Sequence, residues 1–280
     1  MHSCAIVVPV YQPVTDPFEQ LSLAQTIKTL VAYPVYIVGP DKLQGYFEEL
    51  VTDASGRIRY KTFKDHFFQS IDGYNDLLLS QCFYQAFDAF EYMLLVQTDA
   101  LVLSSDLESW CAKQYSYVGA PWYEGYTRPT LPLTLTSVGN GGFSLRRVPD
   151  FIRVLSRPRL FKNVLMQSWP GGLISTVYRY LKDYHCVAFG NAHFNIKVNE
   201  DLFWGLFVSQ QCKFFSVPSP AEALSFAFEA HPDHSYRLNN YTLPFGCHAW
   251  RRYQSEFWYK TLNDEGLEIG RLLQDLKLKE

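Results

Sequence analysis

Short apolar runs of strand length alternate with amphipathic stretches of helical length through the first hundred residues of this chain. Residues 4–10 and 35–38 are apolar throughout and rich in β-branched side chains, and residues 57–63 predict a third short strand. Strands that are apolar on both faces are typical of a parallel sheet buried between two layers of helices. The hydrophobic pattern therefore predicts an α/β fold.

Three helices are expected around these strands. Asp16, Pro17 and Glu19 supply an N-cap, a first-turn proline and an acid three residues after the cap, and apolar residues follow at helical spacing to residue 30. Asp41 is placed to cap a second helix through residue 50, and residues 76–90 carry the apolar stripe of a third. Strands and helices in this order form a doubly wound, Rossmann-like half.

The apolar run of residues 92–96 ends abruptly in Gln97, Thr98 and Asp99. In open α/β sheets ligands bind beyond the carboxyl ends of the strands, so Asp99 is expected where a nucleotide or a metal ion binds. The alternative for an Asp that closes a strand is a turn residue or a helix N-cap. The chain has no G-x-G-x-x-G motif and no P-loop, so the signatures of dinucleotide-binding and ATP-binding folds are missing.

After Asp99 the regular alternation ends. Residues 117–122 predict a short strand that runs into a turn, and residues 139–146 place three glycines before another strand. Glycine lets a backbone turn tightly and approach a ligand closely, although hairpin turns use the same residues. Further helices are expected at residues 149–155 and 172–184.

Neither an internal repeat nor a low-complexity linker interrupts the chain. One domain is therefore predicted for residues 1–280, with a nucleotide half (1–105), an acceptor half (106–260) and a C-terminal helical tail (261–280).

Charge and aromatic content indicate which classes of ligand the protein binds. The formal net charge is −3 and 19% of the residues are charged, so no nucleic-acid partner is expected. Aromatic residues make up 16% of the chain, which suits stacking on sugars but is equally explained by core filling.

The six cysteines form no C-x-x-C pair, and several lie inside apolar runs, which favours reduced thiols in a cytoplasmic protein. The first residues lack a basic n-region, and no apolar run approaches 18 residues. The chain is expected to be soluble, or peripheral at the inner face of the membrane at most.

Two later stretches carry candidate chemistry. Glu200 and Asp201 open an amphipathic run, where they either stabilise a helix N-terminus or provide a general base for an acceptor hydroxyl. His248 lies in an apolar turn beside Pro244 and Gly246, where it is either a structural histidine or a group held rigidly toward a ligand.

Taken together, these stretches resemble a bacterial family of GT-A-type glycosyltransferases long classified as a domain of unknown function. The resemblance runs from about residue 4 to residue 258 and rests on six short motifs in order, at residues 7–11, 92–99, 118–122, 139–146, 199–201 and 244–250. It implies a GT-A-like fold, in which a Rossmann-like nucleotide half is fused to an acceptor half around one mixed, mostly parallel sheet. The implied reaction transfers a sugar from a nucleoside diphosphate sugar, most often a UDP-sugar, to a hydroxyl of a surface glycan or lipid-linked glycan.

The resemblance also implies roles for individual residues. Gln97, Thr98 and Asp99 stand at the family's Asp-x-Asp motif, whose first acid reaches the donor ribose and whose second reaches the metal. Asp99 keeps the metal-facing place, whereas Gln97 replaces the first acid with an amide that can still bind a ribose. The remaining donor and acceptor contacts fall on Pro9, Val10 and Tyr11 for the base and on Gly141 and Gly142 for the sugar.

Asp201 falls where inverting members of the fold place the base that deprotonates the acceptor, with Glu200 assisting the acceptor or the loop. Mn²⁺ or Mg²⁺ is the expected cofactor, with Asp99 and His248 as ligands, because both ions prefer oxygen and Mn²⁺ also accepts an imidazole. Without a metal, Arg146 or Arg251 is the candidate for holding the phosphates.

Three alternatives stay open at this stage. A protein of the same fold that binds nucleotide sugars or carbohydrates without turnover is compatible with Gln97. Nucleotidyl transfer shares the acidic strand end but usually needs a basic loop after the first strand, and residues 10–16 contain no Lys or Arg. A retaining transferase differs from an inverting one in the configuration of its product.

Overall fold

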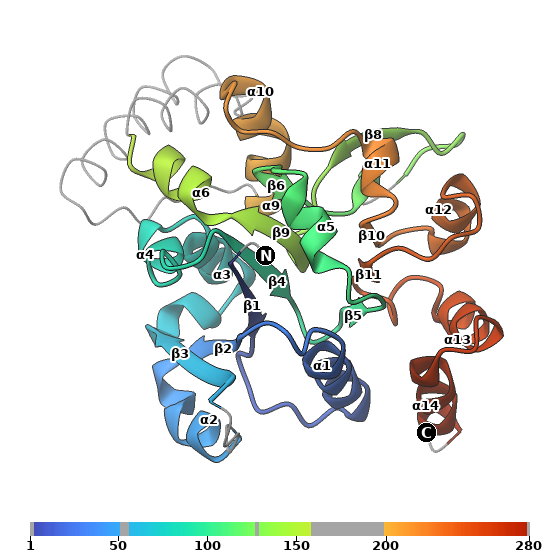
Figure 1. Ribbon diagram of the computed structural model, residues 1–280, viewed down its shortest axis with the longest axis horizontal. Helices are drawn as coiled ribbons and strands as arrows, with labels where there is room; N and C mark the ends of the chain where they lie inside the picture. Colours follow the sequence, from blue (N-terminus) through green and yellow to red (C-terminus); the bar gives the residue numbers. More distant parts are fainter. Residues whose placement is uncertain (1–2, 51–55, 127–128, 158–198, 279–280) are drawn as a thin grey trace.

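The structure is a computed structural model that describes residues 3–50, 56–126, 129–157 and 199–278. In this part of the chain the central sheet has six strands in the order β3, β2, β1, β4, β9, β6 (Figure 1). Their bounds are β1 (Cys4–Pro9), β2 (Val35–Pro40), β3 (Ile58–Phe63), β4 (Tyr92–Val96), β6 (Tyr117–Val118) and β9 (Phe143–Arg147).

The first four strands of this order run parallel, and β9 is antiparallel to both β4 and β6. The predicted fold class is therefore confirmed: a Rossmann-like first half is completed by two strands from the second half in one mixed, mostly parallel sheet. β1 lies between β2 and β4 and is parallel to both, as expected of apolar strands in a buried parallel sheet.

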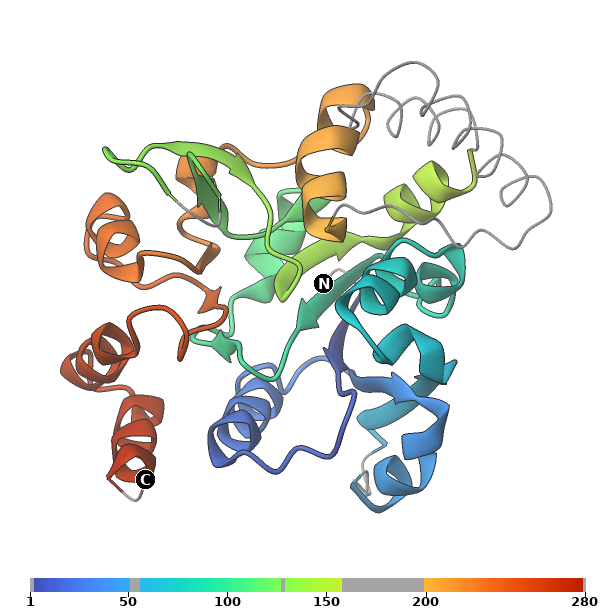
Figure 2. The ribbon, with the colours of Figure 1, turned by 180° about the vertical axis from the view of Figure 1, so that it is seen from behind.

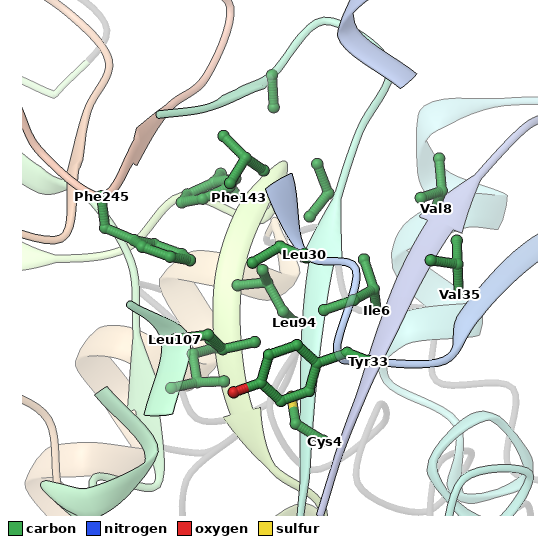
Figure 3. Packing of buried hydrophobic residues seen from close by; sticks show 14 of the residues in the cluster. Cys4, Ile6, Val8, Leu30, Tyr33, Val35, Leu94, Leu107, Phe143 and Phe245 are labelled. Carbon is green, nitrogen blue, oxygen red and sulfur yellow. The ribbon is translucent and has the colours of Figure 1, made fainter. Parts of the chain in front are cut away.

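Alternation along β1 and β4 explains why both strands are apolar throughout. Ala5 and Val7 point into one core, together with Met93 on β4, while Ile6 points into the other beside Leu94. Because successive side chains of a strand face opposite sides of a sheet, burial of both faces requires apolar residues at every position. Figure 3 shows the second of these cores, where residues of β1, β2, β4 and β9 meet Leu107 and Phe245.

Helices cover both faces of the sheet (Figures 1 and 2). The first core is closed by residues of α3, α4, α6 and the π-helix η3, and the second by Leu30 and by residues of α5. The bounds of the helical elements are α1 (Pro17–Thr29), η1 (Asp41–Leu43), α2 (Gln44–Leu50), η2 (Asp65–Phe68), α3 (Ile71–Leu78), α4 (Gln81–Gln85), α5 (Leu107–Ala112), α6 (Val148–Leu155), α9 (Glu200–Leu202), η3 (Phe203–Val208), α10 (Ser209–Gln211), α11 (Pro220–Ala223), α12 (Pro232–Leu238), α13 (Ser255–Asp264) and α14 (Glu268–Lys277).

Asp16 caps α1 as expected, with its carboxylate accepting from the N–H groups of Phe18 and Glu19. The helix expected through residue 50 is present as α2, but its predicted cap is wrong. Asp41 lies inside η1 and makes no cap hydrogen bond, because the chain first forms a tight 3₁₀ turn after Pro40.

The single helix expected at residues 76–90 is replaced by α3 and α4. Ser80 separates them. Its hydroxyl donates to the carbonyl of Leu77 at the end of α3, and it accepts from the N–H of Phe83, which makes Ser80 the N-cap of α4.

Two smaller sheets continue the second half of the chain. One is a three-stranded sheet in the order β10 (Ala227–Phe228), β11 (Gly246–Cys247) and β5 (Leu101–Val102). The other pairs β7 (Pro121–Tyr123) with β8 (Leu135–Val138). The strand predicted at residues 117–122 is thus divided between two sheets, because the chain crosses from β6 to β7 at Gly119, which packs directly on the backbone of Gly139.

At the C-terminus α13 and α14 pack on each other, and Lys28 of α1 pairs with Glu268 of α14 at 2.5 Å. The helix expected at residues 172–184 lies outside the described residues. No described helix has the length and apolar character needed to cross a membrane. Free thiols occur at Cys82, which is exposed, and at four buried positions, Cys4, Cys111, Cys212 and Cys247.

Candidate functional site

The end of β4 is joined to the three-stranded sheet by a tight turn. The N–H of Ala100 donates to the carbonyl of Gln97 at 3.0 Å, and the chain then enters β5. In the antiparallel pair of β5 and β11, Leu101 lies opposite Cys247. This register brings His248, the first residue after β11, to the side of Asp99.

Asp99 and His248 meet at the predicted site although 149 positions separate them along the chain. His248 Nε2 lies 3.3 Å from Asp99 Oδ1 and 3.1 Å from Gln97 Oε1. The His248 side chain is 14% exposed and that of Asp99 is 45% exposed. The imidazole is thus mostly buried, whereas the carboxylate beside it is open to solvent. The structure thus brings together three of the residues that the sequence singled out.

A residue that the sequence reasoning missed completes this group. Glu229 follows β10 directly, and its Oε1 lies 3.0 Å from His248 Nδ1. The parallel register of Phe228 with Cys247 puts Glu229 beside His248. The available signal was an acid that closes a short apolar run at residues 226–228, the same pattern that marked Asp99.

The carboxylates of Asp99 and Glu229 determine the charge of the His248 imidazole. Burial by itself lowers the pKa of His248, but hydrogen bonds and charge attraction from Asp99 and Glu229 outweigh it and raise this pKa to about 10. Burial acts to raise the pKa of Asp99, yet contact with His248 holds that pKa below its usual value. At neutral pH the ring is therefore an imidazolium that donates from both nitrogens.

The glycine-rich turn before β9 lies against the Nε2 end of the His248 ring. The N–H of Gln97 donates to the carbonyl of Gly142 at 2.8 Å, which continues the β4–β9 pairing by one residue. A Cβ at Gly142 would overlap the imidazole of His248. Asn140, at φ 77°, shapes the turn by accepting with its side-chain oxygen from the N–H of Gly142 at 3.0 Å. Close approach to the ring therefore requires glycine at position 142.

The same turn holds Asp201. Gly141 donates its N–H to Asp201 Oδ2 at 3.3 Å, and Leu202 donates to Asp201 Oδ1 at 2.8 Å. Burial raises the pKa of Asp201 above its usual value, and the charge of Glu229 adds to this rise. The cap position of this helix is Asn199, so Asp201 is not the N-cap residue. A partly buried carboxylate with a raised pKa has the character of a base, although its role stays a prediction.

Glu200 points away from Asp201 into the protein. Its carboxylate makes a bidentate contact with Arg146, at 2.8 Å to Nη2 and 2.9 Å to Nη1, and its side chain is 3% exposed. Arg146 Nη2 also donates to the carbonyl of Gly141 at 3.5 Å. Of the two roles expected for Glu200, assisting the acceptor or the loop, the geometry favours the loop.

The remaining predicted residues are at or near the same sheet edge. Val10 packs in the second core, whereas Tyr11 is 58% exposed just beyond β1; Pro9, the last residue of β1, and Thr98 are partly exposed. For Pro9, Val10 and Tyr11 the contact with the base stays a prediction, and so does the donor contact of Thr98.

The arginines named as metal-free alternatives are engaged elsewhere. Arg146 is fully buried against Glu200, which raises the pKa of its guanidinium further, so Arg146 as a phosphate ligand is wrong. Arg251 pairs with Asp16 at 2.7 Å and lies over the ring of Phe18.

No group of three or more His, Cys, Asp and Glu side chains in the described residues is arranged to hold a metal ion. Asp99 and His248 nevertheless fit as a pair. Two ligands at right angles, each about 2.1 Å from a cation, lie about 3 Å apart, close to the observed 3.3 Å between Oδ1 and Nε2. Binding would have to displace the proton on Nε2, since only a neutral imidazole ligates.

Comparison with known proteins adds a family and a set of fold relatives. Residues 57–248 match the family described as "Protein of unknown function (DUF5672)". No curated protein matches the chain.

Three solved structures each have a TM-score of 0.49. Mouse xyloside xylosyltransferase 1 in its apo form is 12% identical, with 88% of this chain and 97% of that chain covered. The galactosyltransferase LgtC with donor and acceptor sugar analogues is 12% identical, with coverage of 87% and 86%. The glycosyltransferase GlyE of Streptococcus pneumoniae is 11% identical, with coverage of 100% and 64%. At these identities the likeness concerns the fold alone.

Proposed function

This chain belongs to the DUF5672 family of proteins of unknown function, and we propose that it is a glycosyltransferase that uses a nucleoside diphosphate sugar, a UDP-sugar, as donor. The acceptor is a hydroxyl group of a surface glycan or a lipid-linked glycan. The observation that carries the proposal is the meeting of Gln97, Asp99 and His248 at the carboxyl end of β4, beside the turn that holds Asp201. Strand ends of this kind are where open α/β sheets bind nucleotides.

Asp201 is the proposed base of an inverting transfer. The acceptor hydroxyl gives its proton to the Asp201 carboxylate while its oxygen bonds to the anomeric carbon of the donor. The bond from that carbon to the diphosphate oxygen breaks, and its electron pair leaves with the diphosphate. Burial supports this role, because a carboxylate with a raised pKa accepts a proton more readily near neutral pH.

Asp99 and His248 would hold a divalent cation, Mn²⁺ or Mg²⁺, which supplies positive charge to the departing diphosphate. Gln97 has an amide where an Asp-x-Asp motif has its first acid, and its oxygen is within hydrogen-bond distance of His248. The side-chain amide of Gln97 would contact the cation or the donor ribose through its oxygen, and unlike an acid it brings no negative charge.

The test combines binding with turnover. Thermal shift with a panel of UDP-sugars, with and without Mn²⁺, should show at least one donor that raises the Tm in the presence of the ion, because a ligand that binds only the folded state stabilises it. That donor should then be hydrolysed or transferred to a glycan. Asp99→Ala should lose the increase in Tm. Asp88 is an exposed acid outside the site, so Asp88→Ala should keep this increase.

Stabilisation without any hydrolysis or transfer would support a binding protein of the same fold instead. Absence of stabilisation by every donor would reject both functions.

A further inference from the structure

Glu229 is a partly buried acid that the proposed reaction does not use. Its side chain is 20% exposed, and its position is fixed by backbone pairing: Ala227 and Phe228 of β10 lie beside Gly246 and Cys247 of β11, and the N–H of His248 donates to the carbonyl of Phe228 at 3.0 Å. Glu229 and His248 are thus the first residues after two paired strands. Their side chains meet because the strands end together.

The contact occupies one specific nitrogen of the ring. Glu229 Oε1 lies 3.0 Å from Nδ1, while Nε2 points to the other side, toward Gln97 Oε1 and Asp99 Oδ1. A carboxylate that accepts a hydrogen bond from Nδ1–H fixes the orientation of the ring, and it also fixes the tautomer once Nε2 has lost its proton.

The backbone of Gly142 also lies against the ring, at its Nε2 end. Gly142 lies so close to the imidazole that a Cβ there would overlap it. Backbone contact at the Nε2 end and the Glu229 carboxylate at Nδ1 restrain the ring from both ends, with Nε2 toward the end of β4. In the described residues, Glu229 is the group that contacts Nδ1.

We propose that Glu229 is a positioning residue that holds His248 through Nδ1, so that Nε2 faces the diphosphate of the donor and its cation. What Nε2 faces rests on the proposed function, whereas the hydrogen bond that holds the ring does not. Carboxylates that orient a ligating histidine typically change metal affinity about 10–100-fold when removed.

Three variants separate the contributions of Glu229. Glu229→Ala removes the acceptor of the Nδ1 proton, and Glu229→Gln keeps an oxygen that can accept it. Asp233→Asn is the matched control, because Asp233 pairs with Arg237 on the nearby helix α12, outside the site. All variants are first compared with the wild type by circular dichroism and by Tm.

The first readout is ¹⁵N NMR of histidine-labelled protein without metal, with the His248 signals assigned from His248→Gln. The Nδ1–H signal of His248 should be protected from exchange in the wild type, in Asp233→Asn and in Glu229→Gln, and lost in Glu229→Ala. The second readout is calorimetric titration with Mn²⁺ alone. Affinity should fall about 10–100-fold in Glu229→Ala, fall less in Glu229→Gln and stay unchanged in Asp233→Asn.

A Glu229→Ala protein that keeps the protected Nδ1–H signal overturns the proposal, and so does one that binds Mn²⁺ as tightly as the wild type. If the wild type itself binds no Mn²⁺, the metal part of the proposed function fails. The NMR signal then still decides whether Glu229 positions the ring.

Discussion

Arg146 and Glu200 form a bidentate ion pair inside the protein, with no exposed area on the first side chain and 3% on the second. Tyr84 and Ser144 satisfy further hydrogen-bonding groups of Arg146, at 2.9 Å and 3.0 Å. The N–H of Glu200 donates to the side-chain oxygen of Asn75 at 3.0 Å. This network connects α3, β9 and α9, and Arg146 extends it to the carbonyl of Gly141 in the glycine-rich turn.

Glu200→Ala should therefore destabilise the protein by about 3–5 kcal/mol, because it leaves the charge of Arg146 buried without a partner. Urea unfolding measures the loss. The double variant Arg146→Met/Glu200→Leu should recover most of it, since no charge stays buried. Glu268→Gln, which breaks an exposed pair with Lys28, serves as the control and should change the free energy of unfolding far less. Equal losses for the buried and exposed pairs would contradict this account.

Asp201→Asn should lower turnover by about 10²–10⁴-fold while donor affinity stays close to that of the wild type. The amide oxygen can keep the shorter hydrogen bond from the N–H of Leu202, whereas the NH2 group replaces the oxygen that accepts from the N–H of Gly141 at 3.3 Å. The amide cannot take the acceptor proton. Steady-state kinetics together with donor titration separates the two effects. Turnover near the wild-type value would remove Asp201 as the base.

Gly142→Ala should displace the imidazole of His248 and weaken Mn²⁺ and donor binding together, because the new methyl group occupies the space of the ring. Gly45→Ala is the matched control, since no heavy atom lies within 4 Å of a Cβ added there and Gly45 is in the helix α2. That control should be neutral or more stable by about 0.5–1 kcal/mol. Titration of both variants with Mn²⁺ checks the difference, and unchanged binding in Gly142→Ala would show that the ring is not held against this backbone.

The paired histidine makes stability depend on pH in a defined direction. The pKa of His248 is raised from 6.5 to about 10 in the folded protein, so the ring binds its proton more tightly folded than unfolded. The resulting stabilisation is fully present below about pH 6.5 and is lost as the pH rises from there toward 10. The difference in unfolding free energy between wild type and His248→Gln, measured in EDTA, should shrink over this range. A difference that stays constant from pH 6 to pH 10 would contradict the charged ring.

The sequence by itself determined the parallel part of the sheet and the position of Asp99. An apolar residue at every position of β1, β2 and β4 is a local property of a strand buried on both faces, and the abrupt change to Gln97 and Asp99 marks where β4 reaches the surface. The N-cap of α1 was visible for the same reason, because Asp16 and the N–H groups it accepts from are within three residues.

Tertiary structure decided the rest of the site. The break at Ser80 depends on the hydroxyl bonding to Leu77 and Phe83 instead of to solvent, a choice that the apolar stripe does not encode. The meeting of Asp99, His248 and Glu229 depends on the registers of the two-residue strands β5, β10 and β11. More than a hundred residues separate β5 from β11, although β10 and β11 are close along the chain. Such short strands carry too little pattern to fix their own pairing, and packing of the folded chain selects it.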